Sequence, residues 1–218
     1  MSYLEYVCEE IKKYNKAEPI YSKTLADTLQ NKFGMEHDKA VAACAVAVSR
    51  IMKEKVIPEL RVYQKGIYYL TVQTVFGELG IDTERLIEDK YIRGEMGYEG
   101  GLALLHRAGL TTQMPNERLI VTNRAKNGHR QDKQLNIYIK PPRVEITPKN
   151  KAYLQVLDML ELLDNAPVDA QNPFGVIATH VEKNGLDFAD LLILADRHYP
   201  RETVIKIAHV AEARGGLI

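Results

Sequence analysis

The side chains that could carry out chemistry in this 218-residue chain are six histidines, two cysteines and scattered carboxylates. The histidines occupy positions 37, 106, 129, 180, 198 and 209. None falls in an H-E-x-x-H motif or pairs with a cysteine at metal-ligand spacing. Because a zinc site needs several such ligands to converge on one ion, we expect no metal site.

Candidate nucleophiles are equally scarce. Cys8 and Cys44 lie in apolar, helix-like surroundings that favour buried free thiols, and no G-x-S-x-G run occurs. Asp82 and Glu84 form a D-x-E pair, but a two-metal nucleotidyl-transfer site also needs a third carboxylate. The D-R-H trio at 196–198 falls late on a predicted helix, where cations complement the helix dipole. We therefore predict no catalytic residue and expect that the protein is not an enzyme.

A glycine-rich stretch, G-Y-E-G-G-L-A-L-L-H-R-A-G-L-T-T-Q over 97–113, is the most distinctive motif of the chain. It does not follow a clear strand of a βαβ unit, and no G-x-x-x-x-G-K-[ST] loop is present. Glycines 97, 100 and 101 instead favour tight turns or close backbone packing. The sequence therefore indicates architecture here, and we expect no nucleotide or other cofactor.

Three helices followed by a hairpin are predicted for the first part of the chain. Apolar periodicity indicates helices over 3–14, 23–33 and 39–55. Two β-prone runs, 60–63 and 67–71, surround a Q-K-G turn. This is the order of a winged helix-turn-helix, in which the third helix enters the DNA groove and the hairpin forms the wing.

The predicted third helix has two different faces when its residues are placed at about 100° intervals. The face predicted to be core holds Val41, Cys44, Ala45, Val48, Ile51 and Met52. The opposite face interleaves cations, which can reach phosphates, with small apolar groups, which can touch thymine methyls. The residues predicted to contact DNA on this face and on the hairpin are Lys39, Ala43, Val46, Arg50, Lys53, Arg61, Gln64 and Lys65. The alternatives are a solvated helix face, or a winged helix that no longer binds DNA and contacts another protein.

The remainder of the chain has a different sequence pattern. Strand candidates at 119–122 and 135–139 and a short buried helix at 102–105 indicate an α+β region, and the chain after the prolines at 141, 142 and 148 is helical throughout. We predict an α+β protein with a winged helix-turn-helix over 1–75 and a second domain over 76–218. The second domain has an α+β part, 76–147, and a helical part, 148–218, and the sequence leaves open whether these are one domain or two.

Charge is unevenly distributed although the net charge is zero. Residues 1–75 hold 11 Lys and Arg against 9 Asp and Glu, whereas residues 151–218 hold 6 against 10. Between 123 and 143, six cations face one acid, and this predicts a second basic patch at Arg124, Lys126, Arg130 and Lys133. No apolar run approaches a membrane span, and the N-terminus is not a signal peptide. We expect a cytoplasmic protein without a membrane partner.

The run G-Y-E-G-G-L-A-L-L-H-R-A-G-L-T-T-Q-M-P-N-E-R-L-I-V-T-N over 97–123 resembles the central motif of AbiEi-type antitoxins of abortive-infection (type IV) toxin–antitoxin systems. The segment 49–78 is similar to that family's winged helix, wing and link, and the helical tail is similar to its C-terminal helices. The resemblance implies an antitoxin that represses its own promoter by binding inverted repeats in double-stranded DNA, as a monomer or a homodimer. It also implies neutralisation of a nucleotidyltransferase-like toxin, with or without direct contact. Arg50, Lys65 and Gly66 match positions where the family places backbone-contacting groups.

Overall fold

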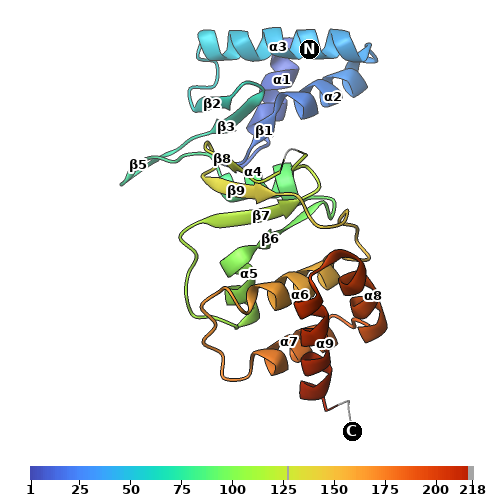
Figure 1. Ribbon diagram of the computed structural model, residues 1–218. Helices are drawn as coiled ribbons and strands as arrows, with labels where there is room; N and C mark the ends of the chain where they lie inside the picture. Colours follow the sequence, from blue (N-terminus) through green and yellow to red (C-terminus); the bar gives the residue numbers. More distant parts are fainter. Residues whose placement is uncertain (127, 216–218) are drawn as a thin grey trace. The chain divides into compact units, whose positions relative to one another are not determined.

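The computed structural model describes residues 1–126 and 128–215, and the chain forms two compact units divided between Leu86 and Ile87 (Figure 1). The chain is α+β, as predicted, with helices at its N-terminus and an all-helical C-terminal segment. The predicted boundary between 75 and 76 lies inside the first unit, because the residues that follow it are bonded there: the Asp82 amide donates to the Ala17 carbonyl at 2.8 Å. None of the described helices is both long enough and apolar enough to cross a membrane.

The first unit combines three helices with a small sheet. Its first elements are α1 (Tyr3–Lys12), β1 (Ile20–Tyr21), α2 (Ser22–Phe33), α3 (His37–Lys53), β2 (Leu60–Gln64) and β3 (Ile67–Leu70). These strands form an antiparallel sheet in the order β1-β3-β2. A separate two-stranded hairpin follows, made of β4 (Gln73–Thr74) and β5 (Gly77–Glu78). The predicted helices and hairpin are present, whereas β1, β4 and β5 have no clear signal in the sequence.

The helix ends of this unit have local causes. α1 begins at a capping box, in which the Ser2 side chain accepts from the Glu5 amide and the Glu5 carboxylate accepts from the Ser2 amide. α2 ends at Gly34, whose φ of +63° suits a C-cap glycine. Ser22 and Asp38 directly precede the predicted helices 23–33 and 39–55 and are residue types that favour the N-cap, but they lie inside the first turns of α2 and α3. Both helices therefore begin slightly earlier than the capping residues predict.

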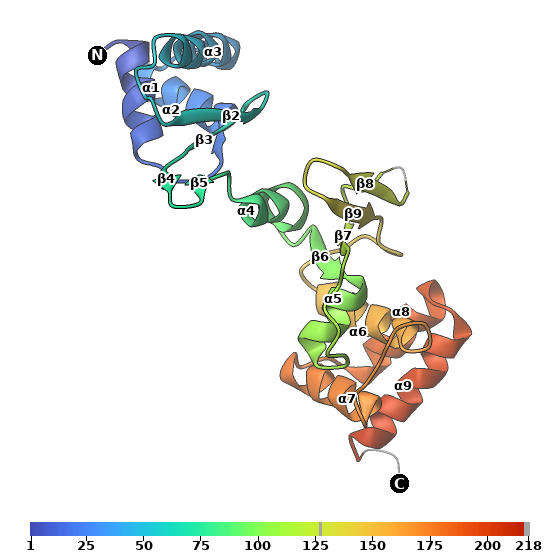
Figure 2. The same cartoon turned by 90° about the vertical axis from the view of Figure 1, so that its left-hand side faces the viewer.

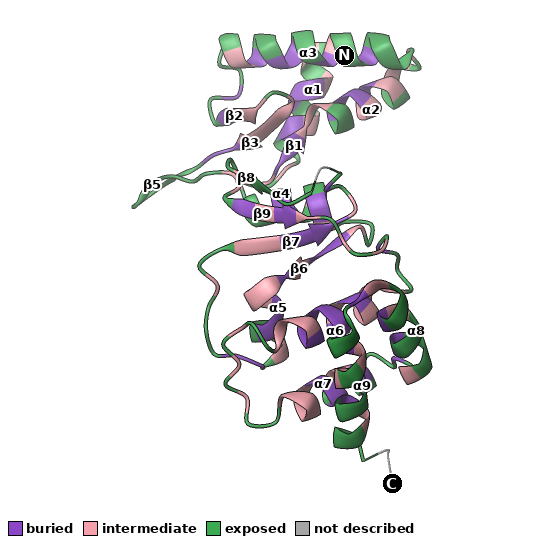
Figure 3. Cartoon of the chain, in the orientation of Figure 1, coloured by how far each residue is buried: buried purple, intermediate pink, exposed green. Residues whose placement is uncertain are grey.

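One apolar core joins the three helices to the sheet of the first unit, and Figure 3 shows its buried residues on the inward sides of the helices. The largest contributors are Val7, Ile11, Ile20, Leu25, Leu29, Val48, Ile51, Leu60 and Leu70. Burying a side chain of this size stabilises the fold by about 1.5–3 kcal/mol. The core therefore fixes which side of α3 faces solvent.

The second unit packs a mixed sheet against a helical layer (Figure 2). Its elements follow α4 (Thr83–Ile87) and are η1, a π-helical turn (Glu88–Ile92), β6 (Gly97–Gly100), α5 (Gly101–Ala108), β7 (Arg118–Thr122), β8 (Arg130–Asp132), β9 (Ile137–Lys140), α6 (Lys151–Leu162), α7 (Pro173–Lys183), α8 (Phe188–His198) and α9 (Arg201–Ala213). The strand order is β6-β7-β9-β8, and β7 pairs with β9 in parallel while the other neighbours are antiparallel. The C-terminal part, predicted to be helical, contains α6, α7, α8 and α9.

The sheet and the C-terminal helices share one core. Tyr98 and Val121 of the sheet belong to the same buried cluster as Leu154, Leu157 and the apolar side chains of α7–α9. The opposite face of the sheet is covered at η1 and buries Ile87, Tyr91, Ile120, Ile137 and Ile139. The proline-marked segment between β9 and α6 is therefore a connection inside one compact unit rather than a linker between two.

Candidate nucleic-acid interface

The core-facing side of α3 differs from the helical-wheel prediction. The buried residues of α3 are Ala40, Cys44, Ala47, Val48 and Ile51. Val41 and Ala45, both predicted to be core, are exposed. The prediction was wrong at these positions because alanine and valine surround this helix on nearly every side. Periodicity alone then cannot say which arc α1 and α2 cover.

The outer side of α3 carries most of the residues predicted to contact DNA. The exposed ones are Lys39, Val46, Arg50 and Lys53, and Val46 has 69% of its surface exposed. Ala43 is half-buried and packs against the core cluster of the first unit. Four of the five predicted helix positions therefore face solvent, and they surround an apolar centre.

Two of the three α3 cations are paired with carboxylates of the same segment. Lys39 Nζ lies 2.9 Å from Glu36 Oε2, and Arg50 Nε lies 2.8 Å from Glu54 Oε1. Lys53 has no carboxylate within ion-pair distance among the described residues. Exposed pairs such as these contribute only about 0.2–1 kcal/mol, so a phosphate could displace either acid at small cost.

The β2–β3 hairpin places Gln64 and Lys65 at its turn, followed by Gly66 with φ +82°. A Cβ at Gly66 would lie 3.0 Å from the Ser22 hydroxyl, and the Ser22 amide donates to the Gly66 carbonyl at 2.9 Å. The turn is therefore held against the start of α2. Lys65 is exposed and, among the described residues, has no carboxylate partner.

Arg61 of β2 is engaged inside the first unit. Its Nη2 lies 2.6 Å from Glu78 Oε1, its Nε lies 3.2 Å from Glu78 Oε2, and its Nη1 donates to the Pro58 carbonyl at 2.7 Å. The hydrogen bond from Arg61 lowers the pKa of Glu78, and Glu78 raises the pKa of Arg61. Arg61 therefore anchors the β4–β5 hairpin, and contact with a phosphate would require this bidentate pair to break.

The β4–β5 hairpin ends in two exposed apolar side chains that the sequence analysis did not single out. Val75 and Phe76 have 94% and 98% of their surfaces exposed, and in Figure 1 the hairpin projects from the three-stranded sheet. Gly77, at φ +108°, closes the turn. An apolar pair followed by glycine between two β-prone runs is the signal that could have indicated this turn.

The second basic patch lies on the second unit, and its members are separated by the sheet. Arg124 and Lys126 follow β7, and Arg130 begins β8 beside the carboxyl end of β9. Lys133 lies beyond the other end of β8, in the turn to β9. All four are exposed, and among the described residues none has a carboxylate within ion-pair distance.

Asp132, the one acid of this patch, is hydrogen-bonded to residues outside the patch. Asp132 Oδ2 accepts from Lys90 Nζ and from the Tyr91 hydroxyl, both at 2.7 Å. Burial raises the pKa of Asp132, but the hydrogen bonds from Lys90 and Tyr91 outweigh it, and the pKa is lower than its usual value. The patch cations therefore have no neutralising carboxylate among the described residues, although Arg124 Nη1 donates to the Lys90 carbonyl at 2.7 Å. Beside them His129 stacks on Tyr138 with ring centroids 5.5 Å apart.

The glycine-rich stretch is built into the sheet. Gly97 and Gly100 lie in β6. A Cβ at Gly97 would lie 2.3 Å from the Tyr91 carbonyl oxygen, and one at Gly100 would lie 2.7 Å from Val121 Cγ2. Gly101 begins α5 at φ +61°. Of the two expected roles, close packing applies to the first two glycines and the strained turn to the third.

The polar residues of the motif are also used internally. Thr112 donates its amide and hydroxyl to Asp169, and the Thr122 hydroxyl donates to the Tyr91 carbonyl at 2.8 Å. The Asn123 side-chain amide makes two hydrogen bonds of 2.8 Å with the backbone of Ile146. The T-T-Q part of the motif therefore joins two loops of the second unit, and the T-N part joins the end of β7 to η1 and to the segment before α6, which agrees with the architectural interpretation.

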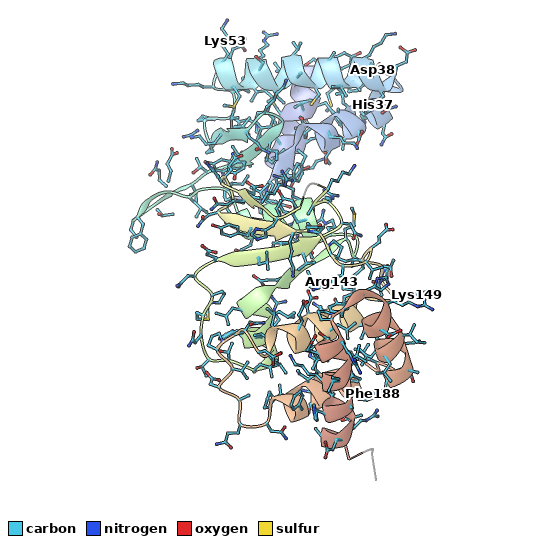
Figure 4. All side chains as sticks on the ribbon, in the orientation of Figure 1. His37, Asp38, Lys53, Arg143, Lys149 and Phe188 are labelled. Carbon is cyan, nitrogen blue, oxygen red and sulfur yellow. The ribbon has the colours of Figure 1, made fainter. Side chains whose placement is uncertain are left out.

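A buried carboxylate lies at the centre of the second unit. Asp158 accepts from the Tyr98 hydroxyl at 2.9 Å and from the Tyr199 hydroxyl at 2.8 Å. Burial raises the pKa of Asp158, although both tyrosine hydroxyls favour its charged form. The Arg143 guanidinium lies 5.0 Å from the centroid of the Tyr199 ring, and Figure 4 labels Arg143 on the connection before α6. Sequence reasoning missed this cluster because its members are separated by 60 and 41 positions.

Neither cysteine is placed for nucleophilic chemistry. Cys8 and Cys44 are buried free thiols, and burial raises the pKa of Cys44 to about 11. A thiol with a raised pKa is a poor nucleophile at neutral pH. Among the described residues, no group of three or more His, Cys, Asp and Glu side chains is placed to hold a metal ion.

Comparison with known proteins gives no family for this chain. No protein-family model matches it, and no curated protein matches its sequence. The resemblance to AbiEi-type antitoxins therefore depends on the residues of 97–123 and its neighbouring segments alone, and it stays a prediction.

Proposed function

We propose that this chain is a DNA-binding antitoxin that represses its own promoter and neutralises a nucleotidyltransferase-like toxin. The observation that carries the DNA-binding part is the element order α1-β1-α2-α3-β2-β3 with the sheet order β1-β3-β2. This order is compatible with a winged helix-turn-helix, and we propose α3 as its recognition helix and the β2–β3 turn as its wing. The antitoxin part depends on the resemblance of residues 97–123, and the protein is proposed to have no enzymatic activity.

The charge of this surface supports phosphate contact at particular residues. Lys53 and Lys65 are exposed cations without a carboxylate partner among the described residues. Lys39 and Arg50 can contribute only after leaving Glu36 and Glu54. The basic patch at 124–133 offers further phosphate contacts from the second unit. We therefore expect modest affinity with a pronounced dependence on salt.

The test is fluorescence anisotropy with duplex DNA from the promoter of the gene, against a scrambled duplex, over a range of salt. We expect tighter binding to the promoter, and each of Lys53→Gln and Lys65→Gln should make the slope of log K against log salt shallower by about 0.9. Lys149→Gln is the matched control, since Lys149 is an exposed lysine outside both proposed contact surfaces (Figure 4). Equal, weak binding of both duplexes would contradict the proposal.

A second candidate function is a protein-interaction module whose winged helix does not bind DNA. The observation that favours it is the apolar centre of the outer side of α3, where Val41 and Val46 are exposed. Absence of promoter binding, together with capture of the product of the adjacent gene by the purified protein, would favour this candidate over the first.

A further inference from the structure

The outer side of α3 is an apolar helix face that no other part of the first unit covers among the described residues. Val41, Ala42, Ala45, Val46 and Ser49 are all exposed, and together they run along the middle of the helix. An apolar groove of about 320 Å³ lies beside them between α1 and α3. Contiguous exposed apolar surface of this kind marks a site of association.

The two ends of this face carry opposite charge. Asp38 lies in the first turn of α3 and Lys53 is its last residue, and Figure 4 shows them near opposite ends of the helix. Neither has an ion-pair partner among the described residues. Around these two residues, Glu36 is paired with Lys39 and Glu54 with Arg50, so neither pair adds net charge. The face is therefore acidic at its beginning, apolar in its middle and basic at its end.

A face with this polarity complements itself when a second copy is turned end to end. An antiparallel pairing can place Asp38 of each copy opposite the partner's Lys53, so the same ionic contact forms at both ends. The same register places Ala42 opposite the partner's Ser49 and Val46 opposite the partner's Ala45. Side chains this small allow two helix axes to approach at the short end of the usual 8–10 Å range. The two ionic ends lie about 22 Å apart along the axis, so the apolar middle is enclosed between them.

We propose that two copies of this chain associate through antiparallel pairing of their α3 helices, with Asp38 of each copy facing Lys53 of the other. A second copy is the occupant because one register matches both charged ends and the apolar middle at once. The pairing is isologous and closes as a two-fold dimer. Its consequence for DNA depends on the function proposed above. The dimer covers the side of α3 assigned to DNA, so self-association and promoter binding exclude each other and the dimer is the inactive form.

The first experiment is sedimentation equilibrium of the full chain across a wide concentration range, for the native protein, Asp38→Lys and Lys53→Glu. Each variant places like charges opposite each other at both ends of the dimer, and we expect each to dimerise about five- to thirtyfold more weakly than the native protein. A native protein that stays monomeric at every concentration, or variants that dimerise as well as the native protein, would overturn the proposal.

Mixing the two variants separates charge pairing from damage to the fold. A heterodimer of Asp38→Lys with Lys53→Glu has an attractive pair at both ends, so the mixture should regain native dimerisation although each variant alone associates more weakly. Thermal melting of each variant confirms that it is folded. An independent variant, Val46→Asp, changes an exposed side chain and should abolish the dimer by placing a carboxylate in its apolar middle. A mixture that stays monomeric would overturn the proposed register.

The DNA measurement distinguishes failure of this inference from failure of the proposed function. Asp38→Lys keeps every cation assigned to DNA and adds one, so the shape of the titration is compared: binding of the native protein should fall off where it dimerises, whereas binding of the variant should keep rising with concentration. If the native protein dimerises as described but neither protein binds the duplex, the dimer stands and the DNA-binding function fails. If binding of the native protein keeps rising through the concentrations at which it dimerises, the dimer does not cover the DNA surface and the regulatory consequence is wrong.

Discussion

The α3 surface of the first unit and the 124–133 patch of the second unit hold similar cations in opposite electrostatic states. On α3, Lys39 and Arg50 each lie within 3 Å of a carboxylate from the same segment. In the patch, Arg124, Lys126 and Arg130 have no such partner among the described residues. Within the part of the chain that the structure describes, nucleic acid would meet two paired cations and the unpaired Lys53 around an apolar centre on α3, and only cations without a carboxylate partner in the patch.

This difference shows why a count of charges along the chain does not give the field at a surface. Residues 1–75 and residues 76–150 each have a net charge of only +2, yet the patch is more positive than the α3 surface. The reason is local: Asp132, the one acid of the patch, is held by Lys90 and Tyr91. On α3 the acids lie one turn from the cations and neutralise them.

The largest expected effect is on the stability of the sheet that carries the 124–133 patch, and it should leave the α3 surface intact. In Gly97→Ala, the new Cβ would lie 2.3 Å from the Tyr91 carbonyl oxygen and 2.8 Å from the Val121 carbonyl oxygen. Both contacts are with backbone, which cannot move without breaking the β6–β7 pairing. We expect the free energy of unfolding to fall by more than about 3 kcal/mol, measured by urea denaturation.

Hydrogen exchange shows which strands and helices lose stability. In Gly97→Ala, amides of β6, β7 and β9 should lose protection while those of α1 and α3 keep it. Gly80→Ala is the matched control, because a Cβ at Gly80 meets nothing within 4 Å. Loss of protection in both units would show that the two surfaces do not belong to independently stable parts.

The next effect is on the pairing of the α3 cations. Glu54→Gln and Glu36→Gln remove the carboxylates that hold Arg50 and Lys39. If the proposed docking is right, each variant should bind promoter DNA more tightly, with a salt slope steeper by up to about 0.9, because one more cation is available to phosphate.

Two comparisons make this result specific to paired cations. Glu9→Gln, which removes an exposed acid of α1, should change the affinity little. Arg124→Gln and Arg130→Gln should make the slope shallower, because these cations are already unpaired. If Glu54→Gln leaves the slope unchanged while Arg124→Gln flattens it, the patch rather than α3 carries the phosphate contacts.

Much of the fold could be predicted from local patterns, because most helices here are amphipathic and end at residues with strong preferences. Gly34 and the glycine of the Q-K-G turn both adopt positive φ. Strand β6 could not be predicted, because three glycines in five residues read as turns. Gly97 and Gly100 lie in a strand instead, where Tyr91 and Val121 approach too closely for a side chain at either position. This close approach results from tertiary packing, and no local sequence pattern indicates it.

The candidate sites were predicted at the level of segments rather than of side chains. Exposure of Lys53 and Lys65 follows from their positions, but the engagement of Arg61 by Glu78 depends on a hairpin 17 residues further along the chain. The core side of α3 was misassigned at Val41 and Ala45 because an alanine- and valine-rich helix has no single apolar stripe. The buried cluster around Asp158 required three segments to meet, and no spacing within one segment reports it.

The smallest expected effect on stability is that of removing the Asp132 carboxylate from the 124–133 patch. Its pKa is lowered by Lys90 and Tyr91, so its charged form stabilises the folded state above its ordinary pKa, and this contribution is lost as the pH falls through the lowered value. Asp132→Asn should therefore cost about 1 kcal/mol near pH 7, and the difference from the native protein should shrink as the pH falls below about 4. Urea denaturation at several pH values measures both.

A double-mutant cycle with Lys90→Gln assigns this cost to the ion pair. If Asp132 serves to hold Lys90, the two substitutions should be non-additive near neutral pH and additive once Asp132 is protonated. Because Asp132→Asn also releases Lys90, the DNA salt slope should steepen slightly, in the same direction as for Glu54→Gln on α3. A slope that steepens for Glu54→Gln but not for Asp132→Asn would mean that the β8 side of the patch lies outside the DNA contact, which would leave Arg124 and Lys126 as its only members within reach of phosphate.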